Sequence, residues 1–281
     1  MNRPVKSMLL KRKDTMQTAP AVFYEDTARH RTLATHKHAV ECAIQVMHTH
    51  MHEVLTLEDL SSVAYLCPSR FKHVFRHLIG IPPGAFLSAL RLQAARQLLL
   101  TTPLSVTDIC FEVGYNSMGS FTSRFTHLVG LSPRLLRQRA QAFEPLAGEP
   151  AERSLTTSSG IPRKRAVLGQ ISATETFRGT IYVGLFSNPV PQGRPVRCTK
   201  ISSPGWYLFY DVPDGIYHLR AAAFPVAADL HSSLLPGEQL LLGNNVSPLV
   251  VRRGGVSGDP DLVLHSPRLT DPPLVMGLPL L

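Results

Sequence analysis

The sequence repeats itself at an offset of about 50 residues, and this repeat restricts the fold more than any other feature. The matched pairs at an offset of 50 are Phe71/Phe121, Phe75/Phe125, Leu78/Leu128, Gly80/Gly130 and Pro83/Pro133. Upstream the offset falls to 49, with the pairs Leu57/Val106, Asp59/Asp108, Leu60/Ile109 and Ala64/Val113. A turn that is one residue longer in the second copy predicts this change of offset, so the repeated unit contains a turn between two elements.

Each copy has the layout of two helices joined by a tight turn. A hydroxyl residue is followed three residues later by an acid, which is the pattern of a capping box, in Thr56-Leu57-Glu58-Asp59 and Ser105-Val106-Thr107-Asp108. The second helix of each copy then places its phenylalanines and leucine at i, i+4 and i+7 on one face. Glycines suited to helix ends or to positive φ stand at Gly80, Gly114 and Gly130. The pattern predicts an all-α tandem helix-turn-helix over residues 36–142.

The outward face of the first copy's second helix carries donors and no acid between Pro68 and Gly80. Its candidate DNA-binding residues are Ser69, Arg70, Lys72, His73 and Arg76. Donors without an intervening carboxylate suit phosphates and base edges. The alternative is a helical bundle with a duplicated hairpin and no role at DNA. The phenylalanine stripe does not separate the two, because it is core in both, so the charge of this face favours nucleic acid.

Residues 39–140 resemble the AraC/XylS family of transcription regulators. The resemblance rests on the two repeat units, on a linker-helix sequence and on a closing motif: Thr56-Leu57-Glu58-Asp59-Leu60, Pro68-Ser69-Arg70-Phe71, Arg91-Leu92-Gln93-Ala94-Ala95-Arg96-Gln97-Leu98-Leu99, Val113-Gly114-Tyr115, Ser120-Phe121-Thr122 and Gly130-Leu131-Ser132-Pro133. The family implies two recognition helices, held about one helical turn apart, that enter successive major-groove faces of double-stranded DNA. It also implies RNA polymerase as a partner.

The resemblance assigns roles by position. In the first copy, Ser69, Lys72 and His73 fall where bases are read, and Arg76 falls where a basic residue meets phosphate. In the second copy the base-reading positions are held by Met118, Gly119, Ser120 and Ser123, and the backbone-contacting positions by Asn116 and Ser117.

The second copy departs from the family pattern. Ser123 stands where the family usually has an arginine, and Thr126 and His127 stand at usually basic positions. Arg124 lies one residue further on, about 100° around the helix. We therefore expect the second helix to contribute shape and backbone contacts more than base readout.

The rest of the chain divides into segments that differ in composition and in the spacing of their apolar residues. Residues 1–35 are polar and basic without periodicity and predict a mostly disordered arm, and 143–165 predict a linker rich in Pro, Gly and Ser. From 166 to 281 the pattern changes to short β-rich runs; the expected strands are 179–186, 206–210, 216–221, 249–252 and 261–264. Pro213-Asp214-Gly215 predicts a hairpin turn between two of them. This hairpin resembles prealbumin-like and carboxypeptidase-regulatory-like domains, which predicts an all-β antiparallel sandwich of about seven strands.

Three roles stay open for the C-terminal region: sensing a small-molecule effector, homodimerisation, and contact with another protein. Four aromatic residues of this region have two interpretations: Trp206, Tyr207, Tyr210 and Tyr217. They either line a ligand pocket or alternate between the core and the surface of a sheet. Because aromatic residues are common in strands, the sequence favours alternation between core and surface.

Composition and motifs exclude several classes of function. Hydrophobic residues make up 44% of 281 residues, which excludes disorder throughout. We find no GxSxG, HExxH or phosphate-loop pattern and therefore predict no enzyme and no cofactor. The series His48, His50 and His52 is interpreted as a solvated helix end rather than a metal site, because on a helix His50 lies away from the face that His48 and His52 share, and a metal would need a carboxylate or cysteine from elsewhere in the chain. The four cysteines contain no CxxC pair and are expected to be reduced and mostly buried in a cytoplasmic protein without membrane spans.

Net charge supports a polyanionic partner only through its distribution. The chain carries +9, but residues 39–140 have nine basic and six acidic residues, a net +3. The prediction is a sequence-specific DNA-binding transcription regulator with a C-terminal β domain for effector sensing or oligomerisation. The alternative is an architectural DNA-binding protein without an effector.

Overall fold

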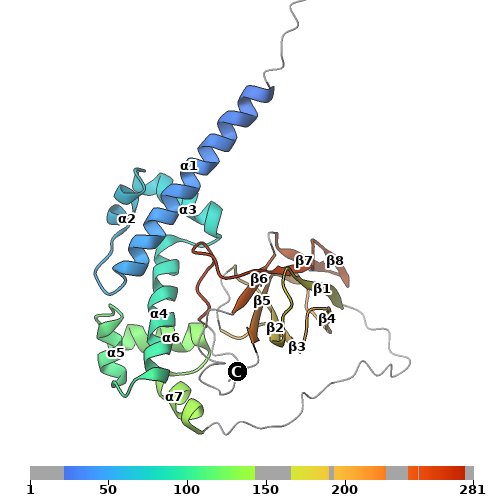
Figure 1. Ribbon diagram of the computed structural model, residues 1–281. Coiled ribbons are helices and arrows are strands. Elements are labelled where there is room, and N and C mark those ends of the chain that lie inside the picture. The colour runs from blue at the N-terminus through green and yellow to red at the C-terminus, as the bar shows by residue number, and fades with distance from the viewer. Residues whose placement is uncertain (1–21, 143–165, 190–192, 226–239, 246, 276–281) are drawn as a thin grey trace, which may run out of the picture. The chain divides into compact units, whose positions relative to one another are not determined.

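The computed structural model describes residues 22–142, 166–189, 193–225, 240–245 and 247–275, with side chains from residue 32 onward. Helices occupy the first of these ranges and strands the others (Figure 1). By its internal contacts the chain divides into residues 1–38 and residues 39–281. Helix α1 (Val22–Thr49) includes residues from both parts. Among the helices within the described ranges, none is long and apolar enough to cross a membrane.

Helix α1 begins earlier than the sequence suggests. It covers residues 22–35, for which we expected an arm without regular structure, while residues 1–21 lie outside the described part of the chain. This stretch mixes charged residues with apolar ones in no clear period, so periodicity alone gives no signal for a helix. The second half of α1 is anchored, because Val40, Ala43, Ile44 and Met47 are fully buried in the first helical core.

The tandem helix-turn-helix is confirmed in detail. Helices α2 (Leu57–Val63) and α5 (Val106–Glu112) have seven residues each and start 49 positions apart. Helices α3 (Pro68–Ile79) and α6 (Met118–Val129) have twelve residues each and start 50 positions apart. Both predicted capping boxes are present, at Thr56 with Asp59 and at Ser105 with Asp108.

The extra residue lies in the turn of the second unit, as the offsets predict. Both first helices end in the same arrangement, in which two backbone N–H groups bond back into the last turn. In the first unit these groups belong to Tyr65 and Leu66, which bond to Ser62 O and Ser61 O; in the second they belong to Gly114 and Tyr115, which bond to Phe111 O and Cys110 O. The first unit then reaches its next N-cap after Leu66, at Cys67, whereas the second inserts Asn116 before the N-cap Ser117.

Helix α4 (Pro83–Thr101) joins the two units and is buried on most of its circumference. Phe86, Leu87 and Leu90 pack into the first core, while Leu92 and Leu99 pack into the second. Figure 1 shows α2 and α3 near one end of α4 and α5 and α6 near the other. Helix α7 (Pro133–Ala142) closes the second core with Leu136 and Ala140. Because α4 is part of both cores, it links the orientation of the first helix-turn-helix unit to that of the second.

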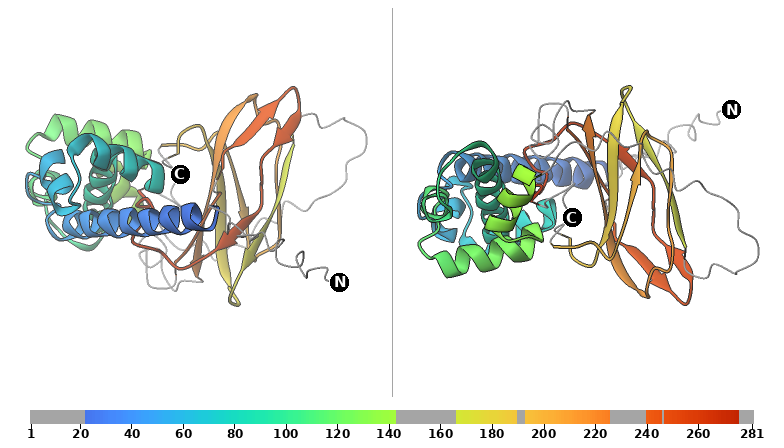
Figure 2. Two further views of the ribbon diagram at one scale, coloured as in Figure 1. Left: turned by 90° about the horizontal axis from the view of Figure 1, so that it is seen from above. Right: turned by 90° about the horizontal axis from the view of Figure 1, so that it is seen from below.

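The C-terminal region is β-rich, with two sheets (Figure 2). The first has the order β4 (Trp206–Phe209), β1 (Val167–Ala173), β9 (Leu262–Leu264). The second has the order β3 (Arg197–Ile201), β2 (Gly179–Phe186), β5 (Gly215–Pro225), β7 (Leu249–Arg252), β8 (Gly255–Ser257), and β6 (Leu241–Asn244) also pairs with β5. One buried cluster takes alternate side chains from both sheets. The linker predicted at 143–165 lies outside the described residues.

The predicted hairpin around Pro213-Asp214-Gly215 is wrong. Strand β4 pairs with β1, whereas β5 pairs with β2, β6 and β7 in the other sheet. Both strands bury alternate residues in the same cluster, among them Phe209 and Leu219. Alternation shows that a strand has one buried face, but it does not tell whether the next strand lies beside it or across the core. The chain instead crosses between sheets, with Val212 fully buried.

Other expectations for the β region are corrected as well. All five predicted strands are present, but β1, β3, β6 and β8 were not expected. The pairing is antiparallel except between β1 and β9, which run parallel. The aromatics behave as core and surface residues: Tyr207 and Tyr217 are buried, with hydroxyls that donate to Pro260 O and Pro213 O, and Trp206 is 64% exposed. The four cysteines form no disulfide within the described residues, yet Cys110 alone is buried; Cys67 and Cys198 are exposed.

Candidate nucleic-acid interface

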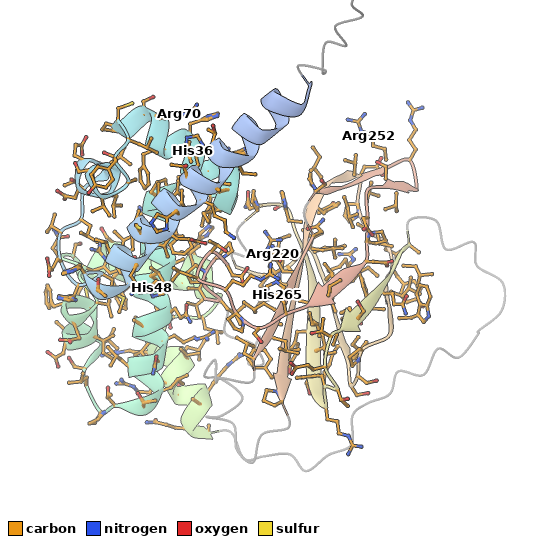
Figure 3. The ribbon with its side chains drawn as sticks, turned by 45° about the horizontal axis from the view of Figure 1, so that its top comes forward. His36, His48, Arg70, Arg220, Arg252 and His265 are labelled. Carbon is orange, nitrogen blue, oxygen red and sulfur yellow. The ribbon has the colours of Figure 1, made fainter. Side chains whose placement is uncertain are left out.

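The first candidate surface is the outward face of α3. The five residues predicted there are all exposed: Ser69, Arg70, Lys72, His73 and Arg76. On the opposite face Phe71 and Phe75 are fully buried, with ring centroids 5.6 Å apart in an edge-to-face contact. This packing fixes the rotation of the helix and therefore turns the donors toward solvent, as Figure 3 shows for Arg70.

The charge of this surface is of one sign. Helix α3 contains no acid along its twelve residues, and its last turn adds His77, which is also exposed. The arginines and lysine bring five-donor and three-donor groups to a convex, solvated helix face. Such a face, about the width of an α-helix, fits the major groove of B-DNA.

The second candidate surface is the outward face of α6 and the turn before it. The predicted residues are again exposed: Asn116, Ser117, Ser120, Ser123 and Arg124. Ser117 is partly engaged within the protein, because its hydroxyl accepts a hydrogen bond from the Ser120 N–H at 3.4 Å. Gly119 is exposed and Met118 is half-buried. The face is therefore rich in small hydroxyl side chains and poor in charge.

Arg124 is held by a contact inside the protein. Its Nη1 donates to Ser88 Oγ of α4 at 3.2 Å, and Ser88 is only 7% exposed. The offset of about 100° from Ser123 thus turns Arg124 toward the linker helix while its side chain stays exposed. Within the described residues, α6 therefore presents no counterpart to Arg70 and Arg76 on the exposed face of α3.

Several residues around α4 join the units, and the sequence interpretation did not assign these contacts. Arg91 donates from Nε to Met51 O and from Nη2 to Glu53 O, both at 2.6 Å. Its guanidinium carbon also lies 5.9 Å from the ring centroid of Tyr115. Burial lowers the pKa of Arg91, and Tyr115 opposes that shift. The partners of Arg91 lie 24 to 40 positions away in the sequence, so no local sequence pattern identifies these contacts.

The histidines after α1 lie beyond the end of the helix. His50 Nδ1 is 3.0 Å and His52 Nε2 is 3.6 Å from the same carboxylate oxygen of Glu53. The hydrogen bond from His50 is the main cause that lowers the pKa of Glu53. In the described part of the chain, no group of three His, Cys, Asp or Glu side chains is arranged to hold a metal ion.

The β region contains a half-buried arginine. Arg220 of β5 donates from Nη2 to Pro189 O at 2.6 Å and from Nη1 to Leu219 O at 3.0 Å, and burial lowers its pKa to about 10. His265 Nδ1 lies 3.7 Å from the carboxylate of Asp271; Figure 3 labels Arg220 and His265. Asp214, in the turn before β5, accepts a hydrogen bond from the Arg253 N–H at 3.1 Å. These contacts hold loops of the β region in place.

Comparisons with known proteins match the helical region. A family model described as a helix-turn-helix domain matches residues 60–139. The HTH-type transcriptional activator AarP of Providencia stuartii is 34% identical over 92 residues, which are 33% of this chain and 68% of AarP. The RCS-specific HTH-type transcriptional activator RclR of Escherichia coli is 37% identical over 90 residues, 32% of each chain.

Among solved structures, the DNA-binding domain of AdpA in complex with a target DNA is 29% identical, with a TM-score of 0.36, over 37% of this chain and 94% of that chain. The chain spans about a third to two fifths of the length of several curated relatives, with shares of 42%, 32% and 34%. The shared part is thus a helix-turn-helix module, and the β region has no counterpart in the family model.

Proposed function

Because the chain belongs to the AraC family of helix-turn-helix transcription regulators, we propose that it binds specific sites in double-stranded DNA through α3 and α6. The two helices enter successive faces of the major groove, as tandem recognition helices do. The observation that carries this proposal is the acid-free, exposed face of α3 inside a unit that the chain builds twice.

The two helices divide the work in this proposal. Lys72, His73 and Ser69 of α3 read base edges, while Arg70 and Arg76 contact phosphates. Helix α6 places hydroxyl side chains in the major groove. The backbone N–H groups at its start, together with Asn116 and Ser117, contact phosphates of the DNA backbone. Specificity therefore resides mainly in the half of the DNA site that α3 occupies.

The β region is proposed to regulate this binding. Its two sheets share one buried cluster, which supports the packing of a β-sandwich. A separate β module in a DNA-binding protein serves to sense a small-molecule effector or to form a homodimer, and the regulator as a whole contacts RNA polymerase. An effector is expected to change the affinity of the full chain for its DNA site.

The first test is selection of duplexes from a random library by the full chain, followed by mobility shifts. The expected result is an affinity for the selected duplex that exceeds the affinity for a scrambled one by about 10³-fold or more at physiological salt. The affinity for both falls as salt is raised, because phosphate contacts release counterions. Equal affinity for both duplexes contradicts the proposal and favours an architectural DNA-binding protein.

The second test concerns the β region. The full chain is screened with a metabolite library by thermal unfolding, and each compound that raises the unfolding temperature is added to the mobility shift. A compound that changes the affinity for the selected duplex supports effector sensing. If every compound leaves both quantities unchanged, the concentration dependence of molecular mass decides for or against homodimerisation.

A further inference from the structure

The two helix-turn-helix units are joined by more than the backbone of α4. The loop between α1 and α2, which belongs to the first unit, is held by Arg91 of α4 through two short hydrogen bonds to Met51 O and Glu53 O. Both acceptors are backbone carbonyls, so the contact depends on the path of the loop and not on its side chains. The guanidinium fork fixes two points of the loop at once, which a single donor does not do.

The turn of the second unit touches the same loop. Gly114 has a φ of +81°, and a Cβ built there would lie 2.7 Å from Met51 O and 2.8 Å from His52 O. The two backbones are therefore in van der Waals contact, at an approach that a larger residue does not permit. The carbonyl oxygen of Met51 is therefore close both to Arg91 of α4 and to the turn of the second unit.

The contacts continue from this turn into α6. Tyr115 follows Gly114, and its ring receives Arg91 on its face and contacts Phe121 of α6 with centroids 5.4 Å apart. The Tyr115 hydroxyl lies 3.0 Å from Ser88 Oγ, which also accepts the hydrogen bond from Arg124 of α6. A continuous set of contacts thus runs from the loop before α2, through α4, to the recognition helix α6.

We propose that Arg91, Gly114, Tyr115 and Ser88 form an inter-unit clamp that fixes the spacing and rotation of α6 relative to the first unit. This inference rests on the proposed DNA binding and concerns which DNA sites are selected. The chain selects sites in which the two contacted segments are separated by one fixed number of base pairs. Without the clamp, α4 still connects the two cores, but the second unit tilts more freely about it. Arg91 and Ser88 are positioning residues, since they act on DNA through α6.

The test uses the full chain and the duplex selected by the wild-type protein, together with two further duplexes in which one base pair is inserted or deleted between the two contacted segments. The wild-type protein is expected to bind the altered duplexes about tenfold or more weakly, since one base pair moves a half-site by about 3.4 Å and rotates it around the axis. Arg91→Ala is expected to bind the native spacing more weakly and to lose most of the penalty for altered spacing.

Ser88→Ala is the second variant, because it leaves a small helix-forming residue on α4 and is expected to fold. It removes the hydroxyl that forms hydrogen bonds with both Tyr115 and Arg124, so it is expected to reduce the spacing penalty in the same direction by a smaller factor. Arg91→Lys keeps the charge but not the fork and is expected to fall between wild type and Arg91→Ala. Arg252→Ala, at an exposed position of β7, removes the same charge from a residue outside the helix-turn-helix units and should leave the spacing penalty unchanged.

The outcomes separate the two proposals. If the wild-type protein prefers no duplex, the proposed function itself fails. If it binds specifically and the folded variants keep the full spacing penalty while losing affinity equally for all three duplexes, the clamp is merely structural and the inference is overturned. If Arg91→Ala does not fold, Ser88→Ala decides between these outcomes.

Discussion

The two helix-turn-helix units have the same backbone plan and different side chains at their exposed positions. Their first helices are equal in length, as are their second helices, and both second helices end at a left-handed glycine, Gly80 with φ 86° and Gly130 with φ 89°. The exposed face of α3 is cationic, whereas that of α6 carries hydroxyls. The buried residues are thus repeated between the two units, whereas the exposed residues are not. We therefore expect the units to differ in the groups that they bind and not in how they fold.

The turns between the two helices of each unit also differ, and here the second unit makes the contact that the first unit lacks. At the residue that follows the C-cap of the short helix, the second unit has Gly114, while the first has Tyr65 with φ 53° and 96% of its surface exposed. Gly114 is needed because another backbone approaches it, and Tyr65 has no such neighbour demanding a small residue. The turn of the second unit therefore packs against the loop of the first unit, whereas the turn of the first unit leaves Tyr65 exposed to solvent.

The largest expected effects test the equality of the two cores. Phe71→Ala and Phe121→Ala each remove a fully buried ring and should lower the free energy of unfolding of their own unit by about 3–5 kcal/mol. Native-state hydrogen exchange of amides in α3 and α6 measures each unit separately. Phe111→Ala, at a 56% exposed position, is the control and should change stability by less than about 0.5 kcal/mol. Strongly unequal losses in the two units would show that the cores are not equivalent.

The next effect tests the inequality of the two surfaces. Lys72→Ala or His73→Ala should weaken binding to the selected duplex by about 1–3 kcal/mol, because each removes a donor from the reading face of α3. Ser123→Ala removes one neutral hydroxyl and should cost less than about 1 kcal/mol. Mobility shifts with the full chain measure all three. If Ser123→Ala is the most damaging, α6 is the main reader and the division of work proposed above is wrong.

A smaller effect concerns how the two recognition helices begin. Ser117 caps α6 through its hydroxyl, whereas Cys67 at the same place before α3 makes no side-chain cap. Ser117→Ala should lower the free energy of unfolding by about 1 kcal/mol, and Cys67→Ser should raise it by about 0.5–1 kcal/mol. Chemical denaturation measures both. Cys67→Ala is the control; an equal gain in that variant would show that the thiol, and not the missing cap, limits stability.

The helical region was predictable because its rules are local. Capping residues, the spacing of Phe71 and Phe75, and the change of offset in the repeat each involve neighbours in sequence. The start of α1 was missed because its first part has no periodic apolar face. In the β region every predicted strand exists, but the pairing of β4 was wrong because pairing depends on partners distant in sequence. In the site, exposure of the named residues followed from helix geometry, whereas the contacts of Arg91 follow from partners 24 to 40 positions away, which no local pattern encodes.

The smallest effect is at Tyr65, and it sharpens the comparison of the two turns. A left-handed conformation costs a residue with a Cβ about 1–2 kcal/mol, and glycine avoids this cost but loses about 0.5–1 kcal/mol more chain entropy on folding. Since the Tyr65 side chain is almost fully exposed, little packing is lost, and Tyr65→Gly should raise the free energy of unfolding by about 0.5 kcal/mol. Thermal and chemical unfolding measure this change, with Tyr65→Phe as a control that keeps the ring and the backbone cost. A stabilised Tyr65→Gly protein that binds the selected duplex more weakly would show that the chain keeps a strained tyrosine for what the ring touches outside the fold. A Tyr65→Gly protein that is destabilised would instead show that the ring packs, and the first turn would then resemble the second more than its exposure suggests.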